Sequence, residues 1–198
     1  EYLTDTLTNE TIEFIKENSQ TQWLAYLSHF SVHTPIQAKK KDILKFESKA
    51  PGTLHNHVIM AAMIKAVDDG VGKIISVLED LKIKERTVVI FYSDNGGYGP
   101  ATSMSPLKGY KGTYYEGGIR VPFFVNWPKV VAAESRCSTP ITGVDIYPTL
   151  QEIITGKNKI DPKIDPRGFL KRVQLKRPKM PLGRLRTAQN RPTKLRTA

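Results

Sequence analysis

The chain contains 198 residues, of which 39% are hydrophobic, and its 30 lysines and arginines against 19 aspartates and glutamates give a formal net charge of +11. This hydrophobic content excludes a wholly disordered protein, and no run of about 18 apolar residues is present that would predict a membrane span. The one cysteine, Cys137, excludes an internal disulfide framework and a zinc site made of cysteines alone. We therefore expect a globular chain, and its charge taken alone favours an anionic partner such as nucleic acid.

The basic excess is confined to the end of the chain. Residues 157–198 contain 14 lysines and arginines and only two aspartates, a net charge of +12, whereas residues 1–156 contain 16 basic and 17 acidic residues. The terminal segment also holds five of the 13 prolines and shows almost no apolar periodicity. We predict a nearly neutral folded part, residues 1–156, and a disordered basic tail, residues 157–198, so that the charge indicates no specific nucleic-acid partner.

The first predicted elements are a helix and a strand. Residues 8–16 combine a candidate N-cap with acidic residues in the first turn and apolar residues at positions 12 and 15, which predicts a short amphipathic helix. Residues 23–27 (Trp-Leu-Ala-Tyr-Leu) form a compact apolar run of strand length. A polar stretch follows, and Pro35 ends it because proline biases the preceding residue toward an extended conformation.

The later elements alternate between helix and strand. Apolar residues recur every three to four positions over residues 55–81, which predicts a long helix. The β-branched and aromatic run at residues 87–92 predicts a strand covered on both faces, residues 121–127 predict another strand, and residues 145–155 predict a short helix. Alternating helices and strands indicate an α/β fold with a largely parallel sheet and flanking helices.

Polar clusters follow two of the predicted strands, where an open α/β sheet gathers its functional groups. Residues 28–33 follow the first strand, and residues 93–97 (Ser-Asp-Asn-Gly-Gly) follow the second. Asp94 and Asn95 place a carboxylate and an amide oxygen side by side, and such hard oxygen donors suit Ca²⁺ or Mg²⁺. The same residues are also good turn-forming chemistry, and spacing alone favours the turn.

A glycine-rich basic loop precedes the next strand. Residues 106–120 contain four glycines together with Lys108, Lys111 and Arg120, an arrangement that can present ammonium groups to an anionic ester. Neither the phosphate-binding pattern Gly-x-x-x-x-Gly-Lys-Ser/Thr nor Gly-x-Gly-x-x-Gly is present, so a nucleotide site is not predicted. Composition alone is equally compatible with a flexible solvated loop in which the two lysines have no role.

Taken together, these motifs resemble a known family. The chain is similar to the C-terminal part of the catalytic domain of type I sulfatases over about residues 20–156, and the similarity is carried by residues 26–35, 90–97, 108–122, 127–128 and 145–150. The resemblance implies an alkaline-phosphatase-like α/β sandwich, present here in part. It also implies a sulfuric ester hydrolase that converts a sulfate ester into an alcohol and inorganic sulfate.

The resemblance also implies roles for individual residues. Asp94 and Asn95 match the pair that ligates an active-site calcium ion, which raises the metal interpretation above the turn. Lys111 matches the lysine that contacts the sulfate and stabilises charge on the leaving oxygen. His33 matches the histidine placed to hydrogen-bond or protonate the departing alkoxide. The match at His29 is looser, and we expect a structural histidine with satisfied hydrogen bonds there.

Other residues of the motifs are expected to have structural roles or none. Glu116 and Arg120 are expected to hold the glycine-rich loop in shape as an ion pair. His55 and His57, at the start of the long predicted helix, are assigned no role.

One part of the family pattern is absent from the sequence. Sulfatases act through a formylglycine made from the Cys or Ser of a Cys/Ser-x-Pro/Ala-x-Arg motif, and the 198 residues contain no such motif. Cys137 does not fit it, because Thr139 and Ile141 stand where the proline or alanine and the arginine would be. We therefore expect this chain alone to bind calcium weakly and to be inactive.

Two alternative functions stay open from the sequence. The first is hydrolysis of a phosphate or phosphonate ester by another member of the same superfamily, which the motif at residues 111–118 argues against. The second is noncatalytic binding of polyanions through the basic tail, with strong dependence on salt. The expected partners are a sulfated small molecule or a sulfated carbohydrate, and export of the intact protein to a periplasmic, secreted or lysosomal location is expected from the family.

Overall fold

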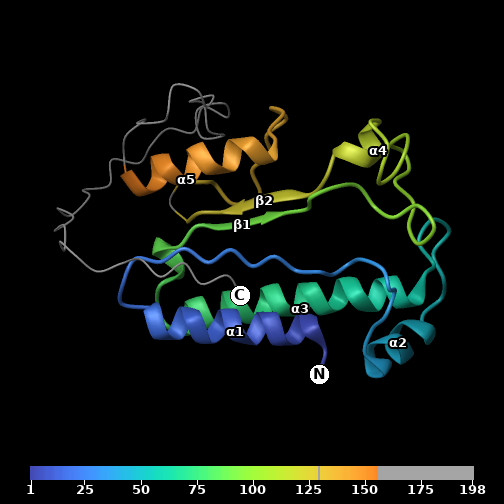
Figure 1. Ribbon diagram of the computed structural model, residues 1–198, viewed down its shortest axis with the longest axis horizontal. Coiled ribbons are helices and arrows are strands. Elements are labelled where there is room, and N and C mark those ends of the chain that lie inside the picture. The colour runs from blue at the N-terminus through green and yellow to red at the C-terminus, as the bar shows by residue number, and fades with distance from the viewer. Residues whose placement is uncertain (129, 156–198) are drawn as a thin grey trace. The chain divides into compact units, whose positions relative to one another are not determined.

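A computed structural model describes residues 1–128 and 130–155, and Figure 1 shows its helices and strands. These residues fall into two compact units that are treated separately, Glu1–Phe124 and the described residues from Val125 onward. The first unit contains helices α1 (Leu3–Asn18), α2 (Lys40–Glu47), α3 (Val58–Asp80) and α4 (Glu116–Ile119), a 3-10 turn at Lys84–Arg86 and strand β1 (Val89–Tyr92). Strand β2 (Phe123–Asn126) begins in the first unit, and the 3-10 helix Gly143–Asp145 and helix α5 (Ile146–Thr155) belong to the second.

Most of the predicted elements are confirmed to within three residues at each end. These are the helices predicted at residues 55–81 and 145–155 and the strands predicted at residues 87–92 and 121–127. The α/β class is therefore confirmed. The short helices α2 and α4 were not predicted, because neither is long enough to show an apolar repeat.

Helix α1 begins at Leu3, five residues before the N-cap that the sequence suggests at Thr8. The reason lies in threonines on its buried face, where Thr8 and Thr11 donate hydroxyl hydrogen bonds of 2.8 Å to the carbonyls of Thr4 and Leu7. These bonds satisfy the hydroxyls inside the helix. The buried face of the first turns is therefore made of small polar residues, which an apolar-periodicity argument does not detect.

Helices α1 and α3 pack side by side and form the scaffold of the first unit (Figure 1). A Cβ atom added to Gly70 on α3 would lie 2.6 Å from the Thr8 hydroxyl oxygen, so the glycine permits the close approach of the two helices. The nearby apolar core consists of Ile15, Leu78 and Ile83. The Trp23 ring contributes to its edge and meets the Phe14 ring edge-on at 6.3 Å.

A network of opposite charges joins α2 to α1 and α3. The Lys39 ammonium lies 2.7 Å from the Asp5 carboxylate and 3.7 Å from that of Asp42, and Lys65 lies 3.6 Å from Asp42 and bonds to Asp69. Asp42 is only 5% exposed. Burial by itself lowers the pKa of Lys39, but the hydrogen bond that its ammonium donates to Asp5 and the charges of the surrounding carboxylates raise that pKa above its usual value. The ion pairs therefore link three helices.

The sheet of the described residues is antiparallel, whereas a largely parallel sheet was expected. Strands β1 and β2 pair with each other, and the chain leaves β1 toward α4 and returns through β2 (Figure 1). Beyond the strands, the amide of Ser93 donates to the Pro122 carbonyl at 3.2 Å and that of Gly96 to the Gly118 carbonyl at 2.8 Å, so the partner number falls as the residue number rises. Antiparallel neighbours can be joined by a loop and need no crossover helix.

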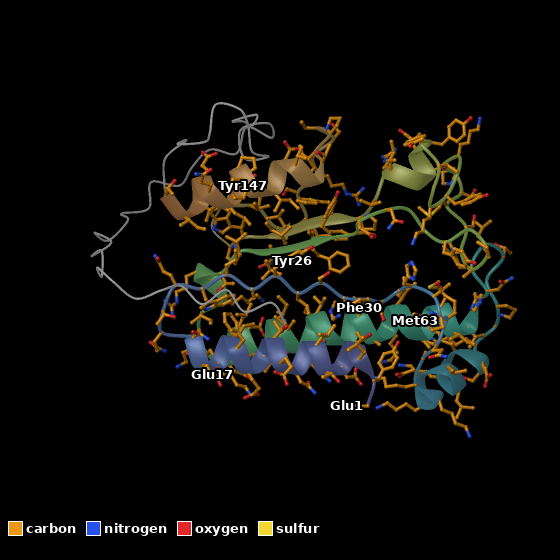
Figure 2. The ribbon with its side chains drawn as sticks, viewed as in Figure 1. Glu1, Glu17, Tyr26, Phe30, Met63 and Tyr147 are labelled. Atoms are coloured by element: carbon orange, nitrogen blue, oxygen red, sulfur yellow. The ribbon has the colours of Figure 1, made fainter. Side chains whose placement is uncertain are left out.

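The strand predicted at residues 23–27 is not a strand in the described part of the chain. The segment is without regular secondary structure, and its side chains alternate between half-buried and exposed up to Phe30. Trp23 faces the core, whereas Tyr26 and Phe30 are 78% and 72% exposed (Figure 2). The alternation is that of a strand, but a strand is assigned by its pairing, and no described segment pairs with this one.

The 3-10 helix Gly143–Asp145, which leads directly into α5 in the second unit, starts with a capping box. The Asp145 carboxylate accepts a 2.7 Å hydrogen bond from the Thr142 amide, and the Thr142 hydroxyl accepts one from the Asp145 backbone amide. The predicted boundary after Gly156 and the predicted disordered tail, residues 157–198, lie outside the described residues. None of the described helices combines the length and the apolar character that crossing a membrane requires.

We expect Asp42→Ala to lower the free energy of unfolding by about 1–2 kcal/mol, because Lys39 and Lys65 both lose the buried carboxylate between them while each keeps one other carboxylate. Urea denaturation followed by circular dichroism measures the change. Glu13→Ala is the matched control, because Glu13 forms an exposed ion pair with Lys16 within α1. Its effect should be much smaller. Equal losses in the two variants would show that the charge network does not hold α2 in place.

Candidate active site

The turn after β1 carries the two candidate metal ligands. Asp94 is exposed and Asn95 is half-buried, and the Asn95 amide nitrogen donates a hydrogen bond to the Asp94 carboxylate. The Ser93 hydroxyl donates to the Asn95 carbonyl at 3.1 Å, which closes the turn. The local structure is thus the turn that the residue types favour, and it places the two side chains together at the end of a strand.

The backbone of this turn lies directly against the backbone of the glycine-rich loop. The Gly96 amide donates to the Gly118 carbonyl at 2.8 Å. A Cβ atom added to Gly96 would lie 1.9 Å from the Gly117 carbonyl oxygen, which is closer than any side chain tolerates. Gly117 is equally confined, because its added Cβ would lie 2.2 Å from the Gly109 carbonyl oxygen. These glycines are therefore required by close contact between two backbone segments.

Lys111 is positioned by its own backbone within the same contact. Its amide donates to the Gly97 carbonyl at 2.9 Å, and the loop is closed by a 2.7 Å bond from the Gly117 amide to the Lys108 carbonyl. Gly109 and Gly112 flank this part of the loop with φ values of +85° and +88°, which glycine adopts without strain. The structure therefore joins the backbone at Lys111 to the segment that directly follows Asp94 and Asn95.

The other charged groups of the loop are engaged elsewhere. The Lys108 ammonium lies 4.0 Å from the centre of the Tyr115 ring, a cation–π contact. Arg120 and Glu116 form the expected ion pair at 3.4 Å, but both side chains are exposed, so the pair contributes little to the shape of the loop. No ion pair or side-chain hydrogen bond of Lys111 occurs among the described residues, which leaves its ammonium group available for an anion.

His33 is exposed and is bonded only locally in the described part of the chain. Its Nδ1 lies 3.0 Å from the Thr34 carbonyl and 3.2 Å from the Thr34 hydroxyl. A carbonyl oxygen only accepts, so the neutral ring carries its proton on Nδ1 when it makes that bond, and Nε2 is left as an acceptor. No described contact joins His33 to Asp94, Asn95 or Lys111. Three of the four predicted site residues are thus brought together through backbone contacts, and His33 is not.

His29 differs from its predicted role. Its ring is partly buried, and among residues 1–128 and 130–155 neither ring nitrogen has a hydrogen-bond partner. Burial lowers the pKa of His29 below its usual value. The ring is therefore neutral at pH 7 and is not the satisfied structural histidine that we expected.

The donor set at Asp94 and Asn95 fits part of a calcium site. The carboxylate and the amide supply hard oxygen ligands, and turning the Asn95 amide by about 180° replaces the nitrogen that faces Asp94 with an oxygen. Calcium takes about six to eight oxygen ligands, so these two residues account for a minority of them. Within the described ranges, no three His, Cys, Asp or Glu side chains lie close enough together to hold a metal ion.

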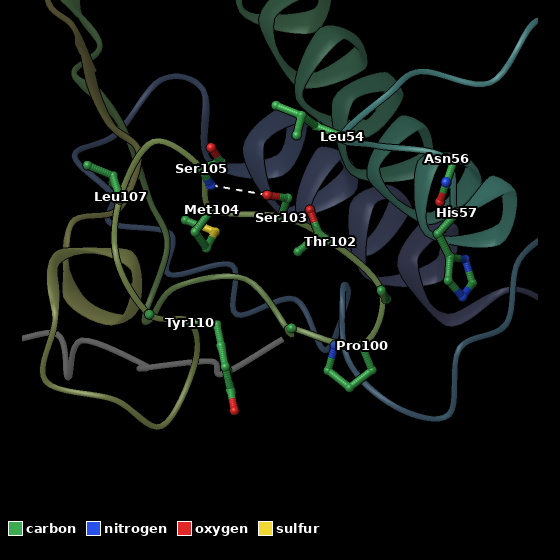
Figure 3. Close-up of a pocket in the computed structure, with 13 residues that line it drawn as sticks. Leu54, Asn56, His57, Pro100, Thr102, Ser103, Met104, Ser105, Leu107 and Tyr110 are labelled. Atoms are coloured by element: carbon green, nitrogen blue, oxygen red, sulfur yellow. Dashed lines mark hydrogen bonds between the residues drawn. The ribbon is translucent and has the colours of Figure 1, made fainter.

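Sequence reasoning missed two histidines that hold nearby structure. His57 accepts a 3.3 Å hydrogen bond from the Met60 amide and so caps α3. His55 Nδ1 lies 3.2 Å from the Thr102 hydroxyl and connects the segment before α3 to the loop after the Asp94 turn. A pocket of about 710 Å³ lies between these two segments (Figure 3). In the sequence, the position of His57 just before the apolar repeat of α3 indicates a capping role. The role of His55 has no such signal, because its partner Thr102 is far away in the sequence.

A family model described as Sulfatase matches residues 1–156 of the chain. The chain belongs to the sulfatase family. It is 37% identical over 168 residues to a sulfatase of Formosa agariphila, a match that covers 79% of this chain and 30% of that protein. It is 30% identical to human steryl-sulfatase over 85% of this chain and 29% of that protein. The chain thus spans less than a third of the length of these two relatives.

The chain is also similar in fold to a solved structure. The chain superimposes on the crystal structure of Ps i-CgsB in complex with k-i-k-neocarrahexaose with a TM-score of 0.75 and 35% identity, over 87% of this chain and 39% of that one. The α/β arrangement of a small sheet and its helices is therefore shared with solved members of this group.

We expect Gly96→Ala to lower the free energy of unfolding by about 1–3 kcal/mol, because the added methyl group forces the two backbone segments apart. The same substitution at Gly72 is the control. Gly72 lies on an exposed position of α3 with no atom near an added Cβ, so alanine there should raise stability by up to about 1 kcal/mol. Urea denaturation of both variants measures the difference, and a neutral Gly96→Ala would contradict the backbone contact.

Proposed function

We propose that this sulfatase chain acts in the hydrolysis of a sulfate ester to an alcohol and inorganic sulfate. The observation that carries the proposal is the pair of backbone bonds, Gly96 to Gly118 and Lys111 to Gly97, which join the Asp94–Asn95 turn to the lysine loop. These bonds join the backbone segments that carry Asp94, Asn95 and Lys111, which supports a shared site. The names of the relatives, a sulfatase and a steryl-sulfatase, support the same activity.

The proposed roles follow from the chemistry of each side chain. Asp94 and Asn95 would hold calcium, which would supply Lewis-acid polarisation of the sulfate when bound. Lys111 supplies a fixed positive charge where negative charge develops on the sulfate and the leaving oxygen. His33, with Nδ1 bonded to Thr34, donates a proton from Nε2 to the alkoxide only when the ring is doubly protonated. The formylglycine nucleophile has no precursor motif among these 198 residues.

The proposal extends to fold and location. We infer that residues 1–156 form part of an alkaline-phosphatase-like catalytic domain, in line with the sulfatase family match over the same residues. We also infer that the protein is exported, as expected for this family. A sulfated carbohydrate or a sulfated small molecule is the proposed substrate class, because human steryl-sulfatase and the carrahexaose complex of Ps i-CgsB represent both types among the similar proteins.

The two alternative functions are less well supported. A phosphate or phosphonate ester hydrolase is disfavoured by the relatives, which are named as sulfatases. Polyanion binding through residues 157–198 concerns a segment outside the described residues. Deletion of residues 157–198 separates the sulfatase proposal from polyanion binding. Sulfate-ester hydrolysis should survive the deletion, and salt-sensitive polyanion binding should be lost.

We expect Lys111→Ala to lower kcat/KM for an aryl sulfate by about 10²–10³-fold in the catalytically complete protein, because the charge that stabilises the transition state is removed. His33→Ala should cause a loss of similar size. Steady-state kinetics with a chromogenic aryl sulfate measures both, and circular dichroism verifies folding.

Lys108→Ala is the matched control for the lysine variant. Lys108 lies in the same loop, but its ammonium group is placed over the Tyr115 ring. Its loss should change turnover much less than loss of Lys111. Near-normal activity in Lys111→Ala, or equal losses in the two lysine variants, would contradict the assigned role.

We expect Asp94→Asn to weaken calcium binding, because a neutral amide replaces a charged oxygen ligand at the metal. Isothermal titration of the protein with Ca²⁺ measures the affinity without relying on activity. Asp80→Asn, the same substitution at the exposed end of α3, is the control and should leave the titration unchanged. An unaltered calcium affinity in Asp94→Asn would exclude this residue as a ligand.

A further inference from the structure

Both polar groups of the Gly97 backbone are hydrogen-bonded, and one of their two partners is a methionine sulfur. The Gly97 carbonyl accepts the 2.9 Å bond from the Lys111 amide that joins the turn after β1 to the glycine-rich loop. The Gly97 amide donates to the Sδ atom of Met104 at 3.2 Å. Residues 1–128 and 130–155 offer this amide no other acceptor. Met104 therefore supports the residue to which the Lys111 backbone is bonded.

The Met104 side chain lies in close contact with the Gly97 backbone. A Cβ atom added to Gly97 would lie 2.9 Å from Met104 Sδ and 2.4 Å from the Cγ2 atom of Thr102, so only a glycine leaves room for both side chains. A methionine side chain is apolar, yet its sulfur is a weak hydrogen-bond acceptor. It therefore fills this space and pairs the amide at the same time. A leucine would occupy a similar volume and leave the amide without a partner.

The chain around Met104 is fixed by local hydrogen bonds. The Leu107 amide donates to the Met104 carbonyl at 2.8 Å. The Ser105 amide donates to the Ser103 hydroxyl at 3.1 Å, and Figure 3 shows this bond beside the methionine. These bonds span the residues on both sides of Met104. The sulfur thus approaches Gly97 from a defined position.

A methionine that only fills space beside the turn is the alternative interpretation. Packing alone requires volume and no acceptor, and it does not account for a sulfur 3.2 Å from an amide nitrogen that has no other partner in the described chain. Leaving a partly buried backbone amide unpaired is costly. The two interpretations differ in what they predict when the sulfur is replaced and the volume is kept.

We propose that Met104 is a positioning residue of the sulfatase site. Its sulfur pairs the Gly97 amide and thereby fixes the Gly97 carbonyl that receives the Lys111 amide. Met104 is not a catalytic residue, because it acts through Lys111. A cation that stabilises developing charge is effective only where it is held in place, so a displaced Gly97 lowers the rate. The inference rests on the proposed function and adds to it a residue outside the charged motif.

Hydrogen exchange followed by NMR tests the bond in the 198-residue chain without turnover. Met104→Leu keeps the side-chain volume and removes the acceptor, so the Gly97 amide should exchange about two- to tenfold faster, the change expected for one lost hydrogen bond. The matched control is Met63→Leu, the same substitution at a methionine of α3 that is 3% exposed. It should leave exchange at Gly97 unchanged. An unaltered exchange rate at Gly97 in Met104→Leu would overturn the proposal.

Norleucine provides a second variant that keeps the linear shape of the side chain. It replaces the sulfur of all four methionines by a methylene group. In the otherwise unaltered chain it should speed exchange at Gly97 as Met104→Leu does. In the Met104→Leu chain it should add nothing, because the acceptor is already gone. An equal effect in both chains would assign the change to another methionine and would contradict the proposed bond.

A double-mutant cycle tests the functional step in the catalytically complete protein. Met104→Leu should lower kcat/KM for an aryl sulfate by about two- to tenfold, and it should cause no further loss in Lys111→Ala. A loss of the same size in both backgrounds would identify a general structural role, and no loss in either would remove Met104 from the reaction. Both results overturn the proposal. Failure of the proposed function is distinct, since Lys111→Ala would then keep normal activity while exchange at Gly97 still responds to Met104→Leu.

Discussion

The contact between the backbone at Gly96 and the backbone at Gly117 and Gly118 determines the geometry of the candidate site. Two loops more than 20 residues apart in sequence touch here without side chains between them, because an added Cβ would lie only 1.9 Å from a carbonyl oxygen. Hydrogen bonds from Gly96 and Lys111 then fix their register. A site that acts on an anionic ester needs its oxygen ligands and its cation at set positions before substrate arrives, and a backbone contact provides this more rigidly than flexible side chains do.

The fold was predictable where the signal is local. The repeat in α3 and the β-branched run of β1 identify their elements because burial on one or two faces determines their composition. The segment at residues 23–27 has strand composition and a strand-like alternation of exposure, yet composition does not supply a pairing partner. The early start of α1 was missed because its buried face consists of threonines whose hydroxyls bond within the helix. Helix α2 depends on the charge partners Lys39 and Asp42, which periodicity does not detect.

The site was predictable in its residue types and not in its assembly. The motif around Asp94 and Lys111 indicates a candidate metal pair and a candidate cation, and the structure places the backbone of their loops in contact. That the glycines make this contact follows only from the three-dimensional path of the chain, since each glycine alone is also compatible with a flexible loop. The expected ion pair of Glu116 and Arg120 forms but is exposed, so the shape of the loop comes from backbone bonds. His33 was selected by its motif, and the described contacts do not yet connect it to the other residues.

The contact between the two loops involves backbone atoms, so removing a side chain and disturbing the contact are separate events. Lys111 enters the contact through its amide, which is bonded to Gly97, and the Gly117 amide closes the loop on the Lys108 carbonyl. Alanine at position 108 or 111 keeps these amide and carbonyl groups, whereas a methyl group at Gly96 meets the Gly117 carbonyl oxygen. Loss of the ammonium group can therefore be distinguished from loss of the backbone contact that positions the loop.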